Sequence, residues 1–159
     1  MKDSYDLVSE IKSGTDSDSE VIATYFRIFD DLYFFGSLYG NTEVRIISDN
    51  TGGKYAGFTR NYWKRIFVHE HEHHPDLVHR GVRIYHYIQT LLHEMCHAFF
   101  GLYGCREEDE DMNQCKECSW VVAEGGHGPA WADMARAIER SSEGYLGLPM
   151  DLPADSHRK

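Results

Sequence analysis

The sequence predicts a single α+β domain in which helices flank a small antiparallel sheet. Three observations predict this class: an apolar stripe at helical spacing over residues 80–102, a shorter one over 18–34, and three strand-like runs between them. The chain has 159 residues, of which 42% are hydrophobic and 13% aromatic. This is enough for one hydrophobic core without disulfides.

Residues 1–17 are polar and acidic, so we expect a flexible N-terminal arm. Ser17 or Asp18 can then cap a helix over 18–34. Its apolar positions recur every three or four residues, at Val21, Tyr25, Ile28, Phe29 and Leu32. Gly36 and Gly40 are expected to end it.

Three strand-like runs follow, over residues 43–48, 55–61 and 65–69. A turn-forming stretch over 50–53 separates the first two runs, and the short connections favour antiparallel pairing. Four histidines lie at the end of the third run and beyond it, and we interpret them as part of a solvated loop. They are His69, His71, His73 and His74.

The helix expected over 80–102 has two different stripes. One is apolar, with Ile84, Ile88, Leu91, Met95 and Phe99. The other contains His86, Thr90, His93 and His97, and we interpret His86 as a polar residue outside any metal site. This helix is therefore predicted to be buried on one face and to present metal-binding groups on another.

An acidic loop is expected over residues 103–119, as an insertion before the last helix. Pro129 suits the first position of a helix over 129–142, with apolar Trp131, Met134, Ala135 and Ile138. Residues 143–159 contain two glycines after Glu143 and two prolines, so they are predicted to be an irregular tail. Residues 18–142 would then form the folded domain.

The long helix carries the pattern H-E-x-x-H, from His93 through Glu94 to His97. Residues four apart on a helix lie on one face, so the two imidazoles can bind one Zn²⁺. Glu94 is next to the first ligand and can act as the general base for water that the metal activates. We therefore expect one catalytic zinc site.

Catalytic zinc normally has three protein ligands. His127 lies between glycines about 30 residues after His97 and is the best third ligand, because glycine neighbours let the backbone approach the helix closely. Glu124 is the alternative, as a carboxylate ligand.

The motif around His93 and the segment Gly126-His127-Gly128-Pro129-Ala130-Trp131 resemble the SprT-like metalloprotease family, which includes the Spartan proteases that cut proteins crosslinked to DNA. Asp31-Leu32-Tyr33-Phe34-Phe35-Gly36 has a counterpart there too, so the resemblance spans residues 20–142. It implies a compact zincin-like domain, zinc on His93, His97 and His127, and Glu94 as the catalytic residue.

Cys105, Cys115 and Cys118 leave three interpretations open: part of a second, structural metal site, a disulfide, or inert thiols. Cys96 is expected to be a small core residue of the long helix. A nucleobase deaminase is excluded, because the H-x-E and the preceding proline of that signature are missing. The acidic run also lacks the glycine of a Ca²⁺ loop.

Basic and aromatic residues alternate around the second and third strand-like runs. Such a surface can contact nucleic acid, although half-buried strands are also aromatic by default. The predicted contacts are Lys54, Arg60, Trp63, Lys64 and Arg65. The net charge of −10 does not exclude DNA, because eight of those charges belong to residues 1–20 and 105–118.

The expected function is a zinc-dependent endopeptidase whose protein or peptide substrate adds as a strand beside residues 65–69. Tyr103 and Tyr145 are candidate oxyanion donors. The alternative is a non-catalytic module in which zinc only stabilises the fold. No signal peptide or membrane-spanning run is visible, so we expect an intracellular monomer, nuclear or cytoplasmic, without a membrane partner.

Overall fold

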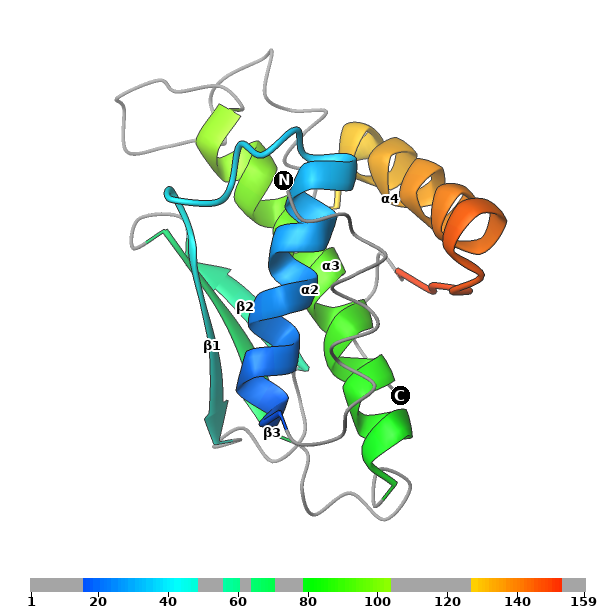
Figure 1. Ribbon diagram of the computed structural model, residues 1–159. Coiled ribbons are helices and arrows are strands. Elements are labelled where there is room, and N and C mark those ends of the chain that lie inside the picture. The colour runs from blue at the N-terminus through cyan, green and yellow to red at the C-terminus, as the bar shows by residue number, and fades with distance from the viewer. Residues whose placement is uncertain (1–15, 49–55, 61–63, 71–78, 104–126, 153–159) are drawn as a thin grey trace.

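The structure, a computed structural model, describes residues 16–48, 56–60, 64–70, 79–103 and 127–152. In chain order these form α2 (Asp18–Tyr33), β1 (Glu43–Ser48), β2 (Gly57–Arg60), β3 (Arg65–Glu70), α3 (Arg80–Tyr103), α4 (Pro129–Ser141) and η4 (Ser142–Leu146). Helices α2 and α3 lie over the same face of the sheet, and α4 lies on the side of α3 away from it (Figure 1). The α+β class is confirmed. The N-terminal arm up to residue 15 and the loop over 104–119 lie outside the described residues.

Helix α2 begins where the sequence offers a capping box. The Ser17 hydroxyl accepts a hydrogen bond from the Glu20 amide, and the Glu20 carboxylate accepts one from the Ser17 amide at 2.7 Å. These two bonds satisfy amides that a helix start leaves without intrahelical partners. The hydrogen bonds to Ser17 also lower the pKa of Glu20.

The turn after α2 is built around Asp30, whose side chain is completely buried. Its two carboxylate oxygens accept hydrogen bonds from the amides of Leu38, at 2.9 Å, and Tyr39, at 2.7 Å. Within the turn, Phe35 and Gly36 have positive φ angles of 59° and 68°. The left-handed conformation suits Gly36 and strains Phe35, whose side chain is 90% exposed.

The sheet has the order β1-β3-β2, so β3 is its central strand. Strands β2 and β3 are antiparallel, as expected, but β1 and β3 are parallel, and for this pair the prediction was wrong. Two successive chain reversals leave β1 and β3 running in the same direction, and pairing them directly makes the sheet mixed. Ile66 and Val68 are fully buried, which suits a central strand.

The central position of β3 corrects two further expectations. A substrate strand cannot add beside residues 65–69, because both edges of β3 are already paired. His69 is not in a solvated loop: it is buried in β3, and its ring lies edge-on to Phe58 of β2. His71, His73 and His74 lie outside the described residues.

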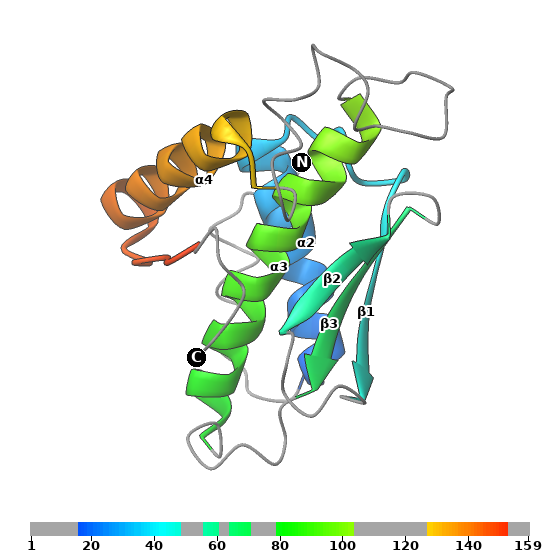
Figure 2. The same cartoon turned by 180° about the vertical axis from the view of Figure 1, so that it is seen from behind.

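Helix α3 packs its predicted apolar stripe into the core. Ile88, Leu91 and Met95 are buried, together with Trp131, Ala135 and Ile138 of α4. Seen from the opposite side, α3 lies between the sheet and α4 (Figure 2). The site motif therefore lies at the centre of the molecule.

Both ends of α3 contact α2 or the turn that follows it. At the start, Arg83 donates to Asp18 at 2.8 Å, and Arg80 also contacts this carboxylate. At the end, the Tyr103 hydroxyl donates to the carbonyl of Ser37 at 2.8 Å. The two helices therefore run in the same direction.

The segment after α4 is more ordered than the sequence suggested. Ser142–Leu146 forms a π-helix, and Met150 and Leu152 are buried against the core. The Leu152 amide donates to the Glu139 side chain at 2.7 Å. The expectation of an irregular tail was wrong for residues 143–146, which are helical. Residues 147–152 are irregular, as expected, but they pack against the core, which their weak apolar pattern did not predict. None of the helices in the described ranges has the length and apolar character needed to cross a membrane.

Candidate metal centre

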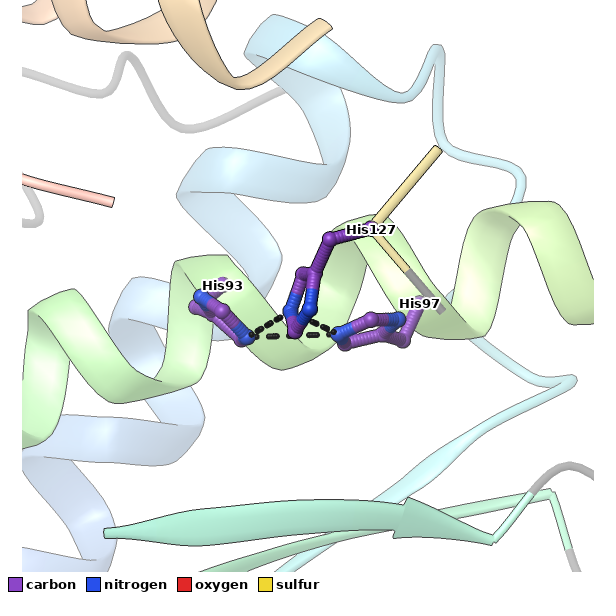
Figure 3. Close-up of side chains that lie close together, drawn as sticks. All are labelled: His93, His97 and His127. Carbon is purple, nitrogen blue, oxygen red and sulfur yellow. Dashed lines mark hydrogen bonds between the residues drawn. The ribbon is translucent and has the colours of Figure 1, made fainter. Parts of the chain in front are cut away.

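Three histidines from two parts of the chain meet beside α3 (Figure 3). His93 and His97 lie one turn apart on α3, and His127 lies immediately before α4. The Gly128 N-cap is extended, and Pro129 begins the helix. This helix start directs the His127 ring toward the other two. His127, predicted as the third ligand, is thus placed beside His93 and His97.

The spacing of the three rings fits a metal ion. The Nε2 atoms of His93 and His127, and of His97 and His127, are 3.0 Å apart, and those of His93 and His97 are 3.2 Å apart. Tetrahedral zinc with nitrogen ligands at 2.0–2.1 Å separates those nitrogens by about 3.3 Å. A neutral imidazole has only one N–H, so ring nitrogens that converge in this way suit a shared cation. The three residues can therefore hold a metal ion.

Burial also favours the metal-binding form of these rings. It lowers the pKa of His93 to about 3, with a further contribution from His97 and His127. Burial and the neighbouring His127 lower the pKa of His97 to about 4. Only the neutral imidazole binds a metal, so protons do not compete for these two ligands at neutral pH.

Trp131 packs against all three histidines. Its ring centroid lies 4.7 Å from that of His93, 5.5 Å from His97, with near-parallel rings, and 4.5 Å from His127. Trp131 is only 1% exposed and lies one turn into α4. The apolar pattern of the last helix predicts Trp131 as a core residue, and its contact with the histidines was not predicted. Its position four residues after His127 was the available signal.

Glu94 lies on the side of α3 that faces β2. It is 6% exposed, and its carboxylate oxygen Oε2 accepts a hydrogen bond of 2.7 Å from the Thr59 hydroxyl. Burial raises the pKa of Glu94 to about 7, although the Thr59 hydrogen bond acts in the opposite direction. A carboxyl group with a pKa near neutrality can both take and return a proton.

Two residues of β2 near Glu94 were not predicted from the sequence. Thr59 provides the hydrogen bond, and Gly57 permits β2 to lie close to α3. The signal for Gly57 was a glycine inside a strand-like run, which often marks a close backbone approach. Thr59 had no signal, because its contact depends on how β2 packs on α3.

The other predicted site residues are either outside the described residues or not placed with the histidines. Cys105, Cys115, Cys118, Glu124, Lys54 and Trp63 are outside the described residues. Cys96 is a buried free thiol, as expected of a core residue, and burial strongly raises its pKa. Tyr145 is almost fully exposed and the Tyr103 hydroxyl donates to Ser37, so neither is placed with the histidines.

The remaining predicted nucleic-acid contacts gather at one end of the sheet. Arg60 ends β2, Arg65 is its partner at the start of β3, and Lys64 lies just before it. Arg65 forms an ion pair with Glu43 at 3.0 Å, which offsets part of the local positive charge. The Arg60 guanidinium lies over the Phe58 ring. Thr59 precedes Arg60 on β2. Because side chains alternate between the two faces of a sheet, Arg60 and its partner Arg65 lie on the face opposite Thr59 and Glu94.

Comparisons with known proteins add no further identification: no protein-family model, curated protein or solved structure matches the chain.

Proposed function

We propose that this protein is a zinc-dependent endopeptidase. The observation that carries the proposal is the convergence of three histidine nitrogens beside a buried carboxyl group, Glu94, on the helix that also carries His93 and His97. A structural zinc site normally has four protein ligands, whereas a catalytic site has three and leaves one position open. Within the described part of the chain three histidines converge, and together with Glu94 they match the second kind of site. The zincin-like fold and the likeness to SprT-like proteases are part of the same proposal.

Among the described strands, β2 pairs only with β3, and its other edge is the proposed substrate-binding edge. The Ala56 carbonyl accepts a hydrogen bond from the His69 amide at 2.9 Å, so Ala56 bonds toward β3. Along an antiparallel ladder this direction alternates, and the backbone groups of Gly57 and Thr59 therefore point away from β3. An extended peptide can add a strand there, close to Glu94.

Each group then has a defined part in peptide hydrolysis. Zinc held by the three histidines would supply a Lewis acid for the scissile carbonyl and the attacking water. Glu94 takes a proton from that water and returns one to the leaving amine. Backbone hydrogen bonds to Gly57 and Thr59 hold the peptide in place, and the buried surroundings of Glu94 limit the access of other water molecules.

Glu94→Gln tests the proposal directly. It keeps the size of the side chain and removes the base, so cleavage of an unstructured protein such as casein should fall by about 10²- to 10⁴-fold. Zinc content, measured by atomic emission, should stay at one ion per chain. Glu143→Gln is the matched control, because Glu143 is exposed in η4 and distant in sequence from the motif.

The same experiment separates the enzyme from a non-catalytic zinc-stabilised module. If the protein is such a module, the wild type would bind zinc and lose stability when a chelator removes it. The wild type would cleave no peptide. Equal cleavage by wild type and Glu94→Gln would contradict the proposed mechanism.

DNA-associated or DNA-crosslinked proteins are the substrate class that we propose for the enzyme. Arg60, Lys64 and Arg65 support this choice, because they lie at the end of the proposed substrate strand. Single-stranded DNA should then accelerate cleavage of a DNA-bound protein, and the gain should fall as salt increases. If DNA does not affect cleavage, the proposed substrate class is contradicted, and the protein would be an endopeptidase without a preference for DNA-bound proteins.

A further inference from the structure

We propose that Thr59 is a positioning residue that orients the Glu94 carboxylate for proton transfer. The catalytic consequence depends on the proposed peptidase function. The geometry does not, because it is a contact between two described side chains. Thr59 is on β2 and Glu94 is on α3, so the contact joins the substrate strand to the site helix.

The Thr59 hydroxyl contacts Glu94 at two atoms. Its oxygen lies 2.7 Å from the carboxylate Oε2 and 2.9 Å from the backbone carbonyl oxygen of the same residue. Both distances are within the range of O–H···O hydrogen bonds. The hydroxyl has one hydrogen, so it donates fully to one of these acceptors at a time, and both acceptors belong to Glu94. The two contacts together hold the Thr59 oxygen beside the Glu94 backbone and carboxylate.

Gly57 makes this contact sterically possible. Thr59 and Gly57 are two residues apart on β2, so they lie on the same face of the strand. A Cβ atom on Gly57 would be 2.6 Å from both the Phe67 carbonyl oxygen and the Thr90 methyl carbon, far inside contact distance. Any side chain at position 57 would therefore push β2 away from α3 and lengthen the Thr59–Glu94 bond.

A hydroxyl suits a partner that gains and loses a proton within one catalytic cycle. It has one hydrogen to donate and two lone pairs that accept. It can donate to Glu94 as a carboxylate. When Glu94 carries a proton on its other carboxyl oxygen, Oε2 can still accept the hydrogen bond from the hydroxyl. The same Thr59 contact is therefore available in both protonation states of Glu94.

Thr59→Val, Thr59→Ser and Thr24→Val form the test. Valine keeps the shape and removes the hydroxyl, whereas serine keeps the hydroxyl. Thr24 is the matched control, because its hydroxyl also bonds a helix carbonyl, that of Glu20 at 2.9 Å, away from the site.

We expect kcat on a peptide substrate to fall by about 10- to 100-fold in Thr59→Val. Losses of this size are typical when a residue that hydrogen-bonds to a reactive group and orients it is removed. KM and zinc content should be unchanged, Thr59→Ser should keep at least half of the wild-type kcat, and Thr24→Val should match wild type. An unchanged kcat in Thr59→Val, or an equal loss in the serine variant, would overturn the proposal.

A second readout does not require activity. In crystal structures of zinc-loaded wild type and Thr59→Val, the Glu94 carboxylate should have one orientation in the first and a different or split one in the second. An identical orientation in both would overturn the positioning role. A wild type that cleaves no peptide, with Glu94 reoriented in Thr59→Val, would contradict the peptidase proposal alone.

Discussion

Asp30 of α2 and Glu94 of α3 are both buried carboxyl groups, but their surroundings differ. Asp30 accepts one backbone amide hydrogen bond on each oxygen. Glu94 has a hydrogen bond from one side-chain hydroxyl to one oxygen. Backbone amides fix a carboxylate permanently, because they cannot rotate or accept a proton. A single hydroxyl leaves the other oxygen of Glu94 available for chemistry.

The difference separates a structural carboxylate from a reactive one. Asp30 holds a turn that contains a strained residue. The stabilisation from its two hydrogen bonds offsets that strain, so Asp30 has a structural role. Glu94 is buried with less compensation, and burial raises its pKa to about 7. A poorly compensated buried acid destabilises a fold, and such acids cluster at functional sites. Three substitutions test this contrast, from the largest expected effect to the smallest.

Asp30→Ala should give the largest loss of stability. It leaves two backbone amides without an acceptor, and hydrogen bonds to a charged group contribute about 1.5–3 kcal/mol each. The free energy of unfolding, from urea titration, should fall by roughly 3–5 kcal/mol. Asp31→Ala is the control, since Asp31 is the exposed neighbour, and it should change little. If Asp30→Ala lowers the free energy of unfolding as little as Asp31→Ala does, Asp30 is not a structural carboxylate and the contrast with Glu94 is wrong.

Glu94→Gln should have the opposite effect on stability, and the effect should depend on pH. The folded-state pKa of about 7 lies above the reference value of 4.5, so the folded chain holds this proton more tightly than the unfolded chain. The contribution of Glu94 to stability therefore falls as pH rises from about 4.5 to about 7.

In zinc-free protein, Glu94→Gln should become more stable than wild type over that window, by up to about 3 kcal/mol. His93 and His97 have lowered pKa values, so they act in the other direction and lose stability as pH falls below 6.5. Both proteins contain them, so their effect largely cancels in the difference. Urea titrations from pH 5 to 8 measure it, and a constant difference between the two proteins would contradict the prediction.

Phe35→Gly should have the smallest effect. The left-handed conformation of Phe35 costs about 1–2 kcal/mol, and its exposed side chain adds little packing. Glycine removes the strain but loses more backbone entropy, so we expect a gain of about 0.5–1 kcal/mol. The melting temperature should rise by a few degrees. A loss of stability would show that the Phe35 ring makes a contact that outweighs the strain.

The sequence was sufficient for most of the local structure and for the three histidines that the structure brings together. The periodic stripe of α3 and the capping box of α2 are local signals, and the structure follows both. His127 could be found because a histidine between glycines is conspicuous and a three-ligand site was already expected. The first two features depend on residues close together in the chain. The third depends on the number of protein ligands that a catalytic zinc ion takes.

The features that the sequence could not predict depend on which segments pack together. Strand order decides whether β3 is an edge or the centre, and nothing in 65–69 alone encodes it. The contact of Thr59 with Glu94 spans 35 residues and exists only because β2 lies against α3. His69 borders a polar stretch of sequence that predicts exposure, but the central position of its strand buries it.

The contacts at both ends of α3 have a mechanical consequence for the site. Arg83 holds the start of the helix to Asp18, and Tyr103 holds its end to Ser37. A slide of α3 by one turn, about 5.4 Å, would break both contacts at once. His93, Glu94 and His97 therefore behave as one rigid part with a fixed register against α2. His127 reaches this helix from the start of α4, so the three-histidine cluster depends also on the packing of α4 against α3.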